Sequence, residues 1–245
     1  MHPRALRRGS FHNVMSSTGP RRPGAGDRDA NDRDAGAGRA ALQPRARATR
    51  LAILTAAAEH FARSGYHATS LDSVLADSGG TKGALYFHFA SKEALARAVI
   101  AEMVQRWGDL RGQLSRCGLD PLSALLALVD EVVRRLIDDP IARGATRLLN
   151  ELPRLAQDAS EHYGCGERDA LALLAQAAQA GLLREGIDPA LVARQIVALI
   201  AGHRQICDAV DDRHNLRQRV DEAWLLLLPT IATDSWLATW RAARQ

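Results

Sequence analysis

The chain has 245 residues, of which 47% are hydrophobic and only 4% aromatic, and the abundance of leucine and alanine predicts an all-α protein. No apolar run reaches the ~18 residues of a membrane span, and the first residues lack the apolar stretch of a signal peptide, so we expect a cytoplasmic protein. The net charge of +4 is concentrated at the N-terminal end, which suits contact with nucleic acid through that part of the chain.

Residues 1–44 are rich in arginine, glycine, aspartate and proline and show no apolar periodicity, so we expect a disordered tail. The tail carries eight arginines against four aspartates. Such a basic segment could add salt-sensitive affinity for DNA, or it could be a solvated extension without that role.

Three short helices are predicted next. The first spans residues 44–64 and is ended by Gly65. Its apolar positions recur at helical spacing: Leu51, Leu54, Ala58 and Phe61. Thr69 or Ser70 caps a second helix that ends near residue 79, and Thr81 caps a third. Two short helices joined by a tight turn are typical of a helix-turn-helix, whose second helix enters the DNA major groove.

Residues 81–95, TKGALYFHFASKEAL, resemble the recognition helix and the following helix of the TetR family of bacterial repressors, specifically its γ-butyrolactone receptor branch. The run from Arg50 to Gly80 also resembles the N-terminal domain of that family. The resemblance implies that the start of the third helix faces the groove, and that later residues and the arginines of the first helix hold phosphates. The predicted DNA-binding residues are Arg45, Arg47, Arg50, Thr69, Thr81, Lys82, Gly83, Ala84, Tyr86, His88 and Lys92.

The aromatic run that ends the third helix allows two interpretations. Its side chains could all belong to the core, or some could face the DNA. We expect Tyr86 and His88 to contact phosphates, and Phe87 and Phe89 to be core residues that pack against Phe61.

A fourth helix is predicted to begin after Ser91, with Lys92 at the N-terminus, where N–H groups and the helix dipole attract an anion. It is long enough to connect two domains and transmit a change of shape. Three Asp–Pro pairs, at 120–121, 139–140 and 188–189, open predicted helices at residues 121–137, 140–152 and 189–210. Further helices are predicted at residues 167–181 and 216–228, with a terminal turn or helix at 235–244. The chain therefore divides into a disordered basic tail (1–44), a helix-turn-helix DNA-binding domain (45–93) and a helical effector-binding and dimerisation domain (94–245).

No motif suggests catalysis, since the sequence has no GxGxxG, Walker loop, HExxH or GxSxG. Three scattered cysteines without a CxxC spacing argue against a disulfide framework or a structural zinc site. His203 and Cys207 are spaced to share a helical face, but two ligands do not make a metal site. We expect no enzyme activity, no cofactor and no metal.

The helices at 189–210 and 216–228 are apolar around much of their circumference and must be buried on more than one side. Two such helices from each chain would form a four-helix homodimer interface, as the resemblance implies, and a monomer core is the alternative. The predicted interface residues are Ile196, Ile200, Val220, Trp224, Leu227 and Leu228.

The resemblance also implies an effector pocket among the C-terminal helices. Its predicted lining is Trp107, Leu126, Val129, Val133, Arg147, Leu148, Glu151, Tyr163, Gln195, Leu199 and His203. Two positions depart from the branch pattern: Gly166 replaces a pocket tryptophan, and Gly202–His203 replaces an apolar residue followed by glutamine. The expected signal is therefore a γ-butyrolactone, or a relative such as a butenolide or furan.

The leading hypothesis is a dimeric repressor that binds a pseudo-palindromic double-stranded DNA operator and is released by this small organic signal. A ligand-independent DNA-binding regulator, whose C-terminal domain only dimerises, is the alternative that Gly166 favours. A helical enzyme with an incidental helix-turn-helix is a third hypothesis. A cavity among the helices of residues 95–210 would favour the first.

Overall fold

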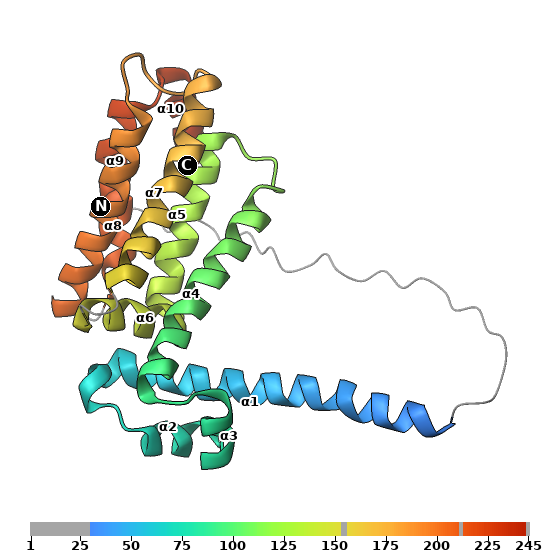
Figure 1. The fold of residues 1–245 in the computed structure, drawn as a ribbon. Coiled ribbons are helices and arrows are strands. Elements are labelled where there is room, and N and C mark those ends of the chain that lie inside the picture. Colours follow the sequence, from blue (N-terminus) through green and yellow to red (C-terminus); the bar gives the residue numbers. More distant parts are fainter. Residues whose placement is uncertain (1–29, 153–155, 211–212, 244–245) are drawn as a thin grey trace.

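The computed structural model describes residues 30–152, 156–210 and 213–243, and this part of the chain is built of helices and connecting turns (Figure 1). Three N-terminal helices lie at one end of the molecule. The fourth helix rises from them into a bundle formed by the C-terminal helices. No helix in the described ranges is long and apolar enough to cross a membrane.

The N-terminal unit consists of α1 (Ala30–Ala68), α2 (Leu71–Ser78) and α3 (Lys82–His88). Ser70 caps α2, because its hydroxyl accepts the Ser73 N–H at 3.0 Å, and Thr81 caps α3 in the same way. Gly79 ends α2 in the left-handed region, with φ at 65°. The caps and turn of the predicted helix-turn-helix are confirmed.

The first helix differs from its predicted bounds at both ends. It begins at Ala30, whereas the sequence predicts a start near residue 44 and a disordered tail before it; residues 1–29 lie outside the described part. The segment before residue 44 is alanine-rich, and alanine has the highest helix propensity. Gly65 interrupts the helical backbone with φ 77° and ψ 177°, so the predicted end is a kink.

The C-terminal part consists of α4 (Lys92–Leu114), α5 (Pro121–Asp138), α6 (Pro140–Glu151), α7 (Ala156–Gln179), α8 (Pro189–Val210), α9 (Leu216–Ile231) and α10 (Asp234–Ala242). Asp120 and Asp139 cap α5 and α6, each followed by a proline in the first helical turn, as predicted. The predicted start of α7 at residue 167 is wrong. The helix continues through Gly164 and Gly166, since packing against α5 and α8 offsets the low helix propensity of glycine.

Helix α6 crosses the base of the bundle and packs against α1 and α4 (Figure 1). The approach to α1 is close: a Cβ added to Gly144 would lie 2.5 Å from the carbonyl oxygen of Ala58. The buried apolar side chains form one continuous core from Ile53 in α1 to Leu237 in α10. The N-terminal unit and the C-terminal helices therefore share a core.

Asp120 also joins α10 to α5, because its carboxylate accepts the indole N–H of Trp236 at 3.0 Å. Burial raises the pKa of Asp120, but hydrogen bonds from Ser123, Trp236 and Leu122 outweigh it, so the pKa lies below its usual value. Because the pKa is lowered on folding, the ionised Asp120 carboxylate stabilises the folded protein. This stabilisation is present above the unfolded-state pKa and is lost as the pH falls through the folded-state pKa.

We expect Asp120→Ala to lower the free energy of unfolding by roughly 1 kcal/mol at neutral pH, the usual cost of a lost N-cap. The difference from the wild type should shrink as the pH falls below about 4, where the free carboxyl group is protonated. Urea unfolding at several pH values measures both effects. Asp109→Ala, on the exposed side of α4, is the matched control and should not lower stability. An equal loss in both variants would contradict the capping role.

Candidate DNA-binding surface and effector pocket

The start of α3 presents small and basic residues to solvent. Thr81, Lys82 and Gly83 are exposed, whereas Ala84 is half-buried and Leu85 is fully buried against the N-terminal core. The Lys82 ammonium lies 3.0 Å from the carboxylate of Asp72 on α2. The hydrogen bond and negative charge of Asp72 raise the pKa of Lys82, so the lysine is cationic at neutral pH. The first turn of α3 is therefore open for close approach and carries a positive charge.

The end of α3 differs from the sequence prediction at one residue. Phe89 is buried, as predicted, but Phe87 is 81% exposed and not part of the core. The reason is helical geometry: Leu85 and Phe89 are four residues apart on the inner face, and Phe87 lies halfway between them on the opposite face. Tyr86 is 57% exposed and His88 is half-buried. Phe87 is a candidate surface residue that the periodicity of its neighbours would have revealed.

The remaining predicted DNA-contact residues lie in four different environments. Arg45 and Arg47 are exposed, and Arg50 lies over the ring of Phe89 at 5.3 Å. The Lys92 ammonium donates to the His67 carbonyl at 3.2 Å, and burial lowers the pKa of Lys92. Thr69 is wrong as a DNA contact: it is 3% exposed, because its hydroxyl donates to the Gly65 carbonyl at 2.7 Å inside the kink.

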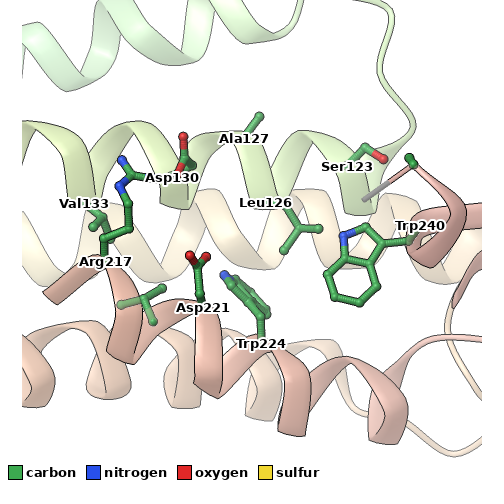
Figure 2. Close-up of a pocket in the computed structure, with 11 residues that line it drawn as sticks. Ser123, Leu126, Ala127, Asp130, Val133, Arg217, Asp221, Trp224 and Trp240 are labelled. Atoms are coloured by element: carbon green, nitrogen blue, oxygen red, sulfur yellow. Dashed lines mark hydrogen bonds and ion pairs between the residues drawn. The ribbon is translucent and has the colours of Figure 1, made fainter. Parts of the chain in front are cut away.

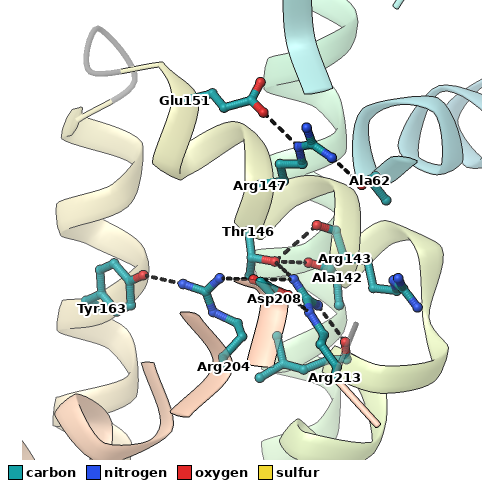
Figure 3. Close-up of polar contacts among 11 residues, drawn as sticks. Ala62, Ala142, Arg143, Thr146, Arg147, Glu151, Tyr163, Arg204, Asp208 and Arg213 are labelled. Atoms are coloured by element: carbon teal, nitrogen blue, oxygen red, sulfur yellow. Dashed lines mark hydrogen bonds and ion pairs between the residues drawn. The ribbon is translucent and has the colours of Figure 1, made fainter. Parts of the chain in front are cut away.

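Two residues predicted to line the effector pocket instead connect α6 with α1 (Figure 3). The Glu151 carboxylate accepts the backbone N–H of Tyr66 and the Nε–H of Arg147, both at 2.7 Å. Arg147 also donates to the carbonyls of Ala62 and Arg63, at 2.9 and 3.0 Å. These bonds satisfy the backbone groups that the kink at Gly65 leaves without helical partners. The pocket prediction for Arg147 and Glu151 is therefore corrected to an interdomain contact.

A second polar network connects α5, α6, α7 and α8 (Figure 3). Buried Arg213 pairs with Asp208 and donates to the Leu136 carbonyl at the end of α5 and to the Thr146 hydroxyl on α6. Buried Arg204 pairs with the same aspartate at 2.9 Å and approaches the Tyr163 hydroxyl at 3.5 Å. Tyr163, another predicted pocket residue, thus contacts this network.

The other predicted pocket residues do not converge on one cavity. Val129, Val133 and Leu148 are core residues, and Gln195 is exposed. Trp107, Leu199 and His203 are half-buried, and the Nδ1 atom of His203 has no hydrogen-bond partner in the described structure. Leu126 and Val133 line a separate cleft beside α9. Except at Gln195, sequence position indicated which of these residues face inward, but whether they enclose a cavity depends on how far apart the helices pack.

A cavity of about 280 Å³ lies among α4, α5 and α7, within the range in which the sequence predicted one. Its walls are largely apolar, with Leu114, Leu128 and Leu173 among the lining residues. Its polar edge is the ion pair of Arg111 on α4 with Asp169 on α7, whose two N–O distances are 2.6 and 2.8 Å. The sequence analysis did not identify these lining residues. The one signal in the sequence is Gly118, which breaks the helical pattern and, with Leu119, lines the edge of the cavity.

Comparison with known proteins places the chain among transcription regulators. The model of bacterial regulatory proteins of the tetR family matches residues 53–99, from the second half of α1 into α4. The A-factor receptor protein of Streptomyces griseus is 35% identical over 81% of this chain and 69% of its own length. The chain belongs to the TetR family.

Solved structures extend the similarity across the helical bundle of this TetR-family chain. A γ-butyrolactone receptor (ArpA-like protein) has a TM-score of 0.65 and 28% identity, covering 82% of this chain and 95% of its own. CprB from Streptomyces coelicolor, in complex with its operator sequence, has a TM-score of 0.67 and 30% identity, covering 80% and 94%. The all-α fold and the γ-butyrolactone receptor branch of the family are confirmed. The chain is a DNA-binding regulator and not an enzyme.

In this TetR-family chain, the residues predicted for the dimer interface point largely into the protomer. Ile196, Val220, Trp224 and Leu228 are buried within the protomer, and Ile200 and Leu227 are half-buried. The outward faces of α8 and α9 instead expose large apolar side chains: Leu191, Ile206, Val210, Leu225 and Leu226. The prediction is wrong for the four buried residues, because both helices are apolar on two sides and the inner sides pack within the protomer, α9 against α5 and α8, and α8 against α7 and α9.

Proposed function

We propose that this TetR-family regulator is a cytoplasmic repressor that binds a pseudo-palindromic DNA operator as a homodimer and is released by a small organic signal. The signal is of the γ-butyrolactone, butenolide or furan type. The observation that carries the proposal is the cavity among α4, α5 and α7, because α4 begins at the DNA-binding unit and ends at the cavity wall. One helix thus connects the site of the signal with the site of DNA contact.

In this proposal the exposed first turn of α3 reads the major groove. Lys82 is the base-reading residue, since a lysine at this end of a recognition helix can reach the acceptors of guanine. Thr81, Gly83 and Ala84 permit close approach. Exposed Phe87 offers an apolar surface to a thymine methyl group. Phosphates are held by Arg45, Arg47, Arg50, Tyr86, His88 and Lys92.

The cavity has the chemistry that a lactone or furan signal requires. Leucine side chains suit an alkyl tail, and the guanidinium of Arg111 is a donor for a lactone carbonyl or a furan carboxylate. A volume of about 280 Å³ is near the lower end of small-molecule sites, which span roughly 300–1,000 Å³. The signal is therefore a compact molecule.

Release follows if the signal changes the position of α4. The two recognition helices of a dimer must lie about 34–36 Å apart, or a multiple of it, to enter successive major grooves. A signal that prefers the released shape lowers operator affinity by the amount of that preference, typically ~1–3 kcal/mol per site. By reciprocity, operator DNA lowers the affinity for the signal by the same factor.

We expect Ala172→Trp to abolish release by the signal while leaving operator affinity unchanged. Ala172 lines the cavity on α7 and is exposed, so an indole at this position fills the cavity without disturbing the core. Ala178→Trp is the matched control, because Ala178 is an exposed residue of the same helix outside the cavity lining. Operator binding is titrated by fluorescence anisotropy with and without synthetic γ-butyrolactones, butenolides and furans.

Equal release in both variants would place the signal elsewhere. A wild-type protein that binds one of these compounds in calorimetry, yet keeps its operator affinity, would show instead a ligand-independent DNA-binding regulator. Such a result would have a physical explanation, because Gly166 replaces the pocket tryptophan of the γ-butyrolactone receptor branch.

For the homodimer, we expect Leu226→Arg to produce a folded monomer. Leu226 is 77% exposed in the protomer, so arginine is tolerated there by the fold but places a charge in the proposed contact between chains. Leu171→Arg, at an exposed leucine of α7, is the control and should remain dimeric. Sedimentation velocity measures both. A Leu226→Arg protein that sediments as a dimer would move the interface away from α9.

A further inference from the structure

A second cleft, of about 300 Å³, lies between α5, α9 and α10 (Figure 2). Its lining residues on α5 are on a different face of that helix from those that line the cavity of the proposed function. It is formed in part by the last described helix. Two tryptophans, Trp224 on α9 and Trp240 on α10, flank the space, and Leu126 of α5 lines it between them. The cleft shares no lining residue with the cavity among α4, α5 and α7.

The tryptophan on α10 is held in place. Trp240 stacks on Trp236, with ring centroids 6.2 Å apart and an interplanar angle of 12°. Trp236 in turn donates its indole N–H to Asp120 at the start of α5. The wall of the cleft is therefore a fixed aromatic surface, and little conformational entropy is lost when a flat molecule binds against it.

The charged residues of the cleft favour a cation. Asp130 on α5 and Arg217 on α9 form an ion pair across one end. Asp221, one turn along α9 from Arg217, adds a second carboxylate next to Trp224 (Figure 2). The lining side chains thus carry two negative charges against one positive charge. A cation over an indole face gains a further electrostatic attraction from the ring.

The exposed apolar face of α9 is a different surface. Leu225 and Leu226 point outward, whereas Arg217, Asp221 and Trp224 share the face that lines the cleft. A ligand in the cleft therefore does not compete with the contact between chains that we place on the outward face.

We infer that this cleft is a second small-molecule site, which binds a planar, apolar organic cation between Trp224 and Trp240. The aromatic plane of the ligand packs against the indoles, and its positive charge lies by Asp221. The site goes beyond the proposed function, because its ligand is a cation and not an uncharged lactone, and because its walls are formed by α9, α10 and a different face of α5.

Proflavine, a flat aromatic cation, is the probe, and calorimetric titration of the full chain without DNA is the measurement. We expect one proflavine bound per chain, and roughly tenfold weaker binding in Trp240→Leu and in Asp221→Asn. Glu222→Gln is the matched control, since Glu222 is the exposed neighbour of Asp221 and points away from the cleft. Acridine at pH 8, which has a similar plane but no charge, should bind more weakly than proflavine.

Unchanged proflavine affinity in Asp221→Asn overturns the inference, whatever happens to the fold of Trp240→Leu. Acridine binding as tightly as proflavine overturns the choice of a cation. Loss of proflavine binding in Ala172→Trp would place the probe in the cavity of the proposed function. Proflavine binding that depends on Asp221 would support the second site even if no lactone or furan released the protein from DNA. The two proposals are therefore tested independently.

Discussion

Gly144→Ala is expected to destabilise the protein by roughly 3 kcal/mol, at the upper end of overpacking effects in a protein interior. The new methyl group would lie 2.5 Å from the Ala58 carbonyl oxygen and 2.9 Å from its Cα. Both are backbone atoms of α1, so no side chain can rotate away and the two helices must separate. The higher helix propensity of alanine offsets this loss of stability by about 1 kcal/mol at most.

The matched control, Gly112→Ala, is expected to change the free energy of unfolding in the opposite direction. Gly112 also lies inside a helix, α4, and a Cβ added there meets nothing within 4 Å. Gly112→Ala should therefore raise the free energy of unfolding by up to about 1 kcal/mol. Urea unfolding of the two variants distinguishes the loss of stability caused by close packing from the gain caused by higher helix propensity. Stabilisation by both substitutions would show that α1 and α6 do not touch through their backbones.

Lys82→Ala is expected to weaken operator binding by roughly 1–3 kcal/mol and to relax the sequence preference at one base pair of each half-site. Tyr86→Phe, at a predicted phosphate contact, should weaken binding to all sequences about equally. Gel-shift titration against the operator and single-base variants distinguishes the two patterns. The dimer should remain intact in both proteins, because neither residue lies on α8 or α9.

Asp72→Asn provides the complementary control. Its carboxylate pairs with Lys82 at the surface and would repel the DNA backbone, so its removal should preserve or increase operator affinity. If Lys82→Ala and Tyr86→Phe both bind the operator as the wild type does, α3 is not the recognition helix.

The sequence predicted those features that depend on a few neighbouring residues. Ser70, Thr81 and Ser91 each cap a helix, and Asp120 and Asp139 each precede a proline at a helix start, because a cap requires only the residues within one turn. The resemblance of residues 81–95 to a recognition helix was specific, and the TetR family followed from it.

The features that depend on packing between distant segments were not predicted. Glu151 was assigned to a pocket because it lies on the inner side of α6, and its partner, the backbone N–H of Tyr66, is 85 residues away in the chain. Trp224 was assigned to a dimer interface because α9 has two apolar sides, and the sequence alone does not say which side faces the protomer's own core. The residues that line the cavity likewise depend on how α4, α5 and α7 pack together, which the sequence alone does not state.

The kink at Gly65 limits how this repressor can be combined with parts of its relatives. A Cβ at residue 65 would lie 2.4 Å from the Glu151 carboxylate, and that carboxylate satisfies the N–H group of Tyr66. A hybrid that joins residues 45–93 to the C-terminal helices of another TetR protein therefore leaves this N–H without its acceptor, unless the new α6 carries a glutamate at the position of Glu151. Transfer of residues 45–151 as one unit would keep this contact between α1 and α6.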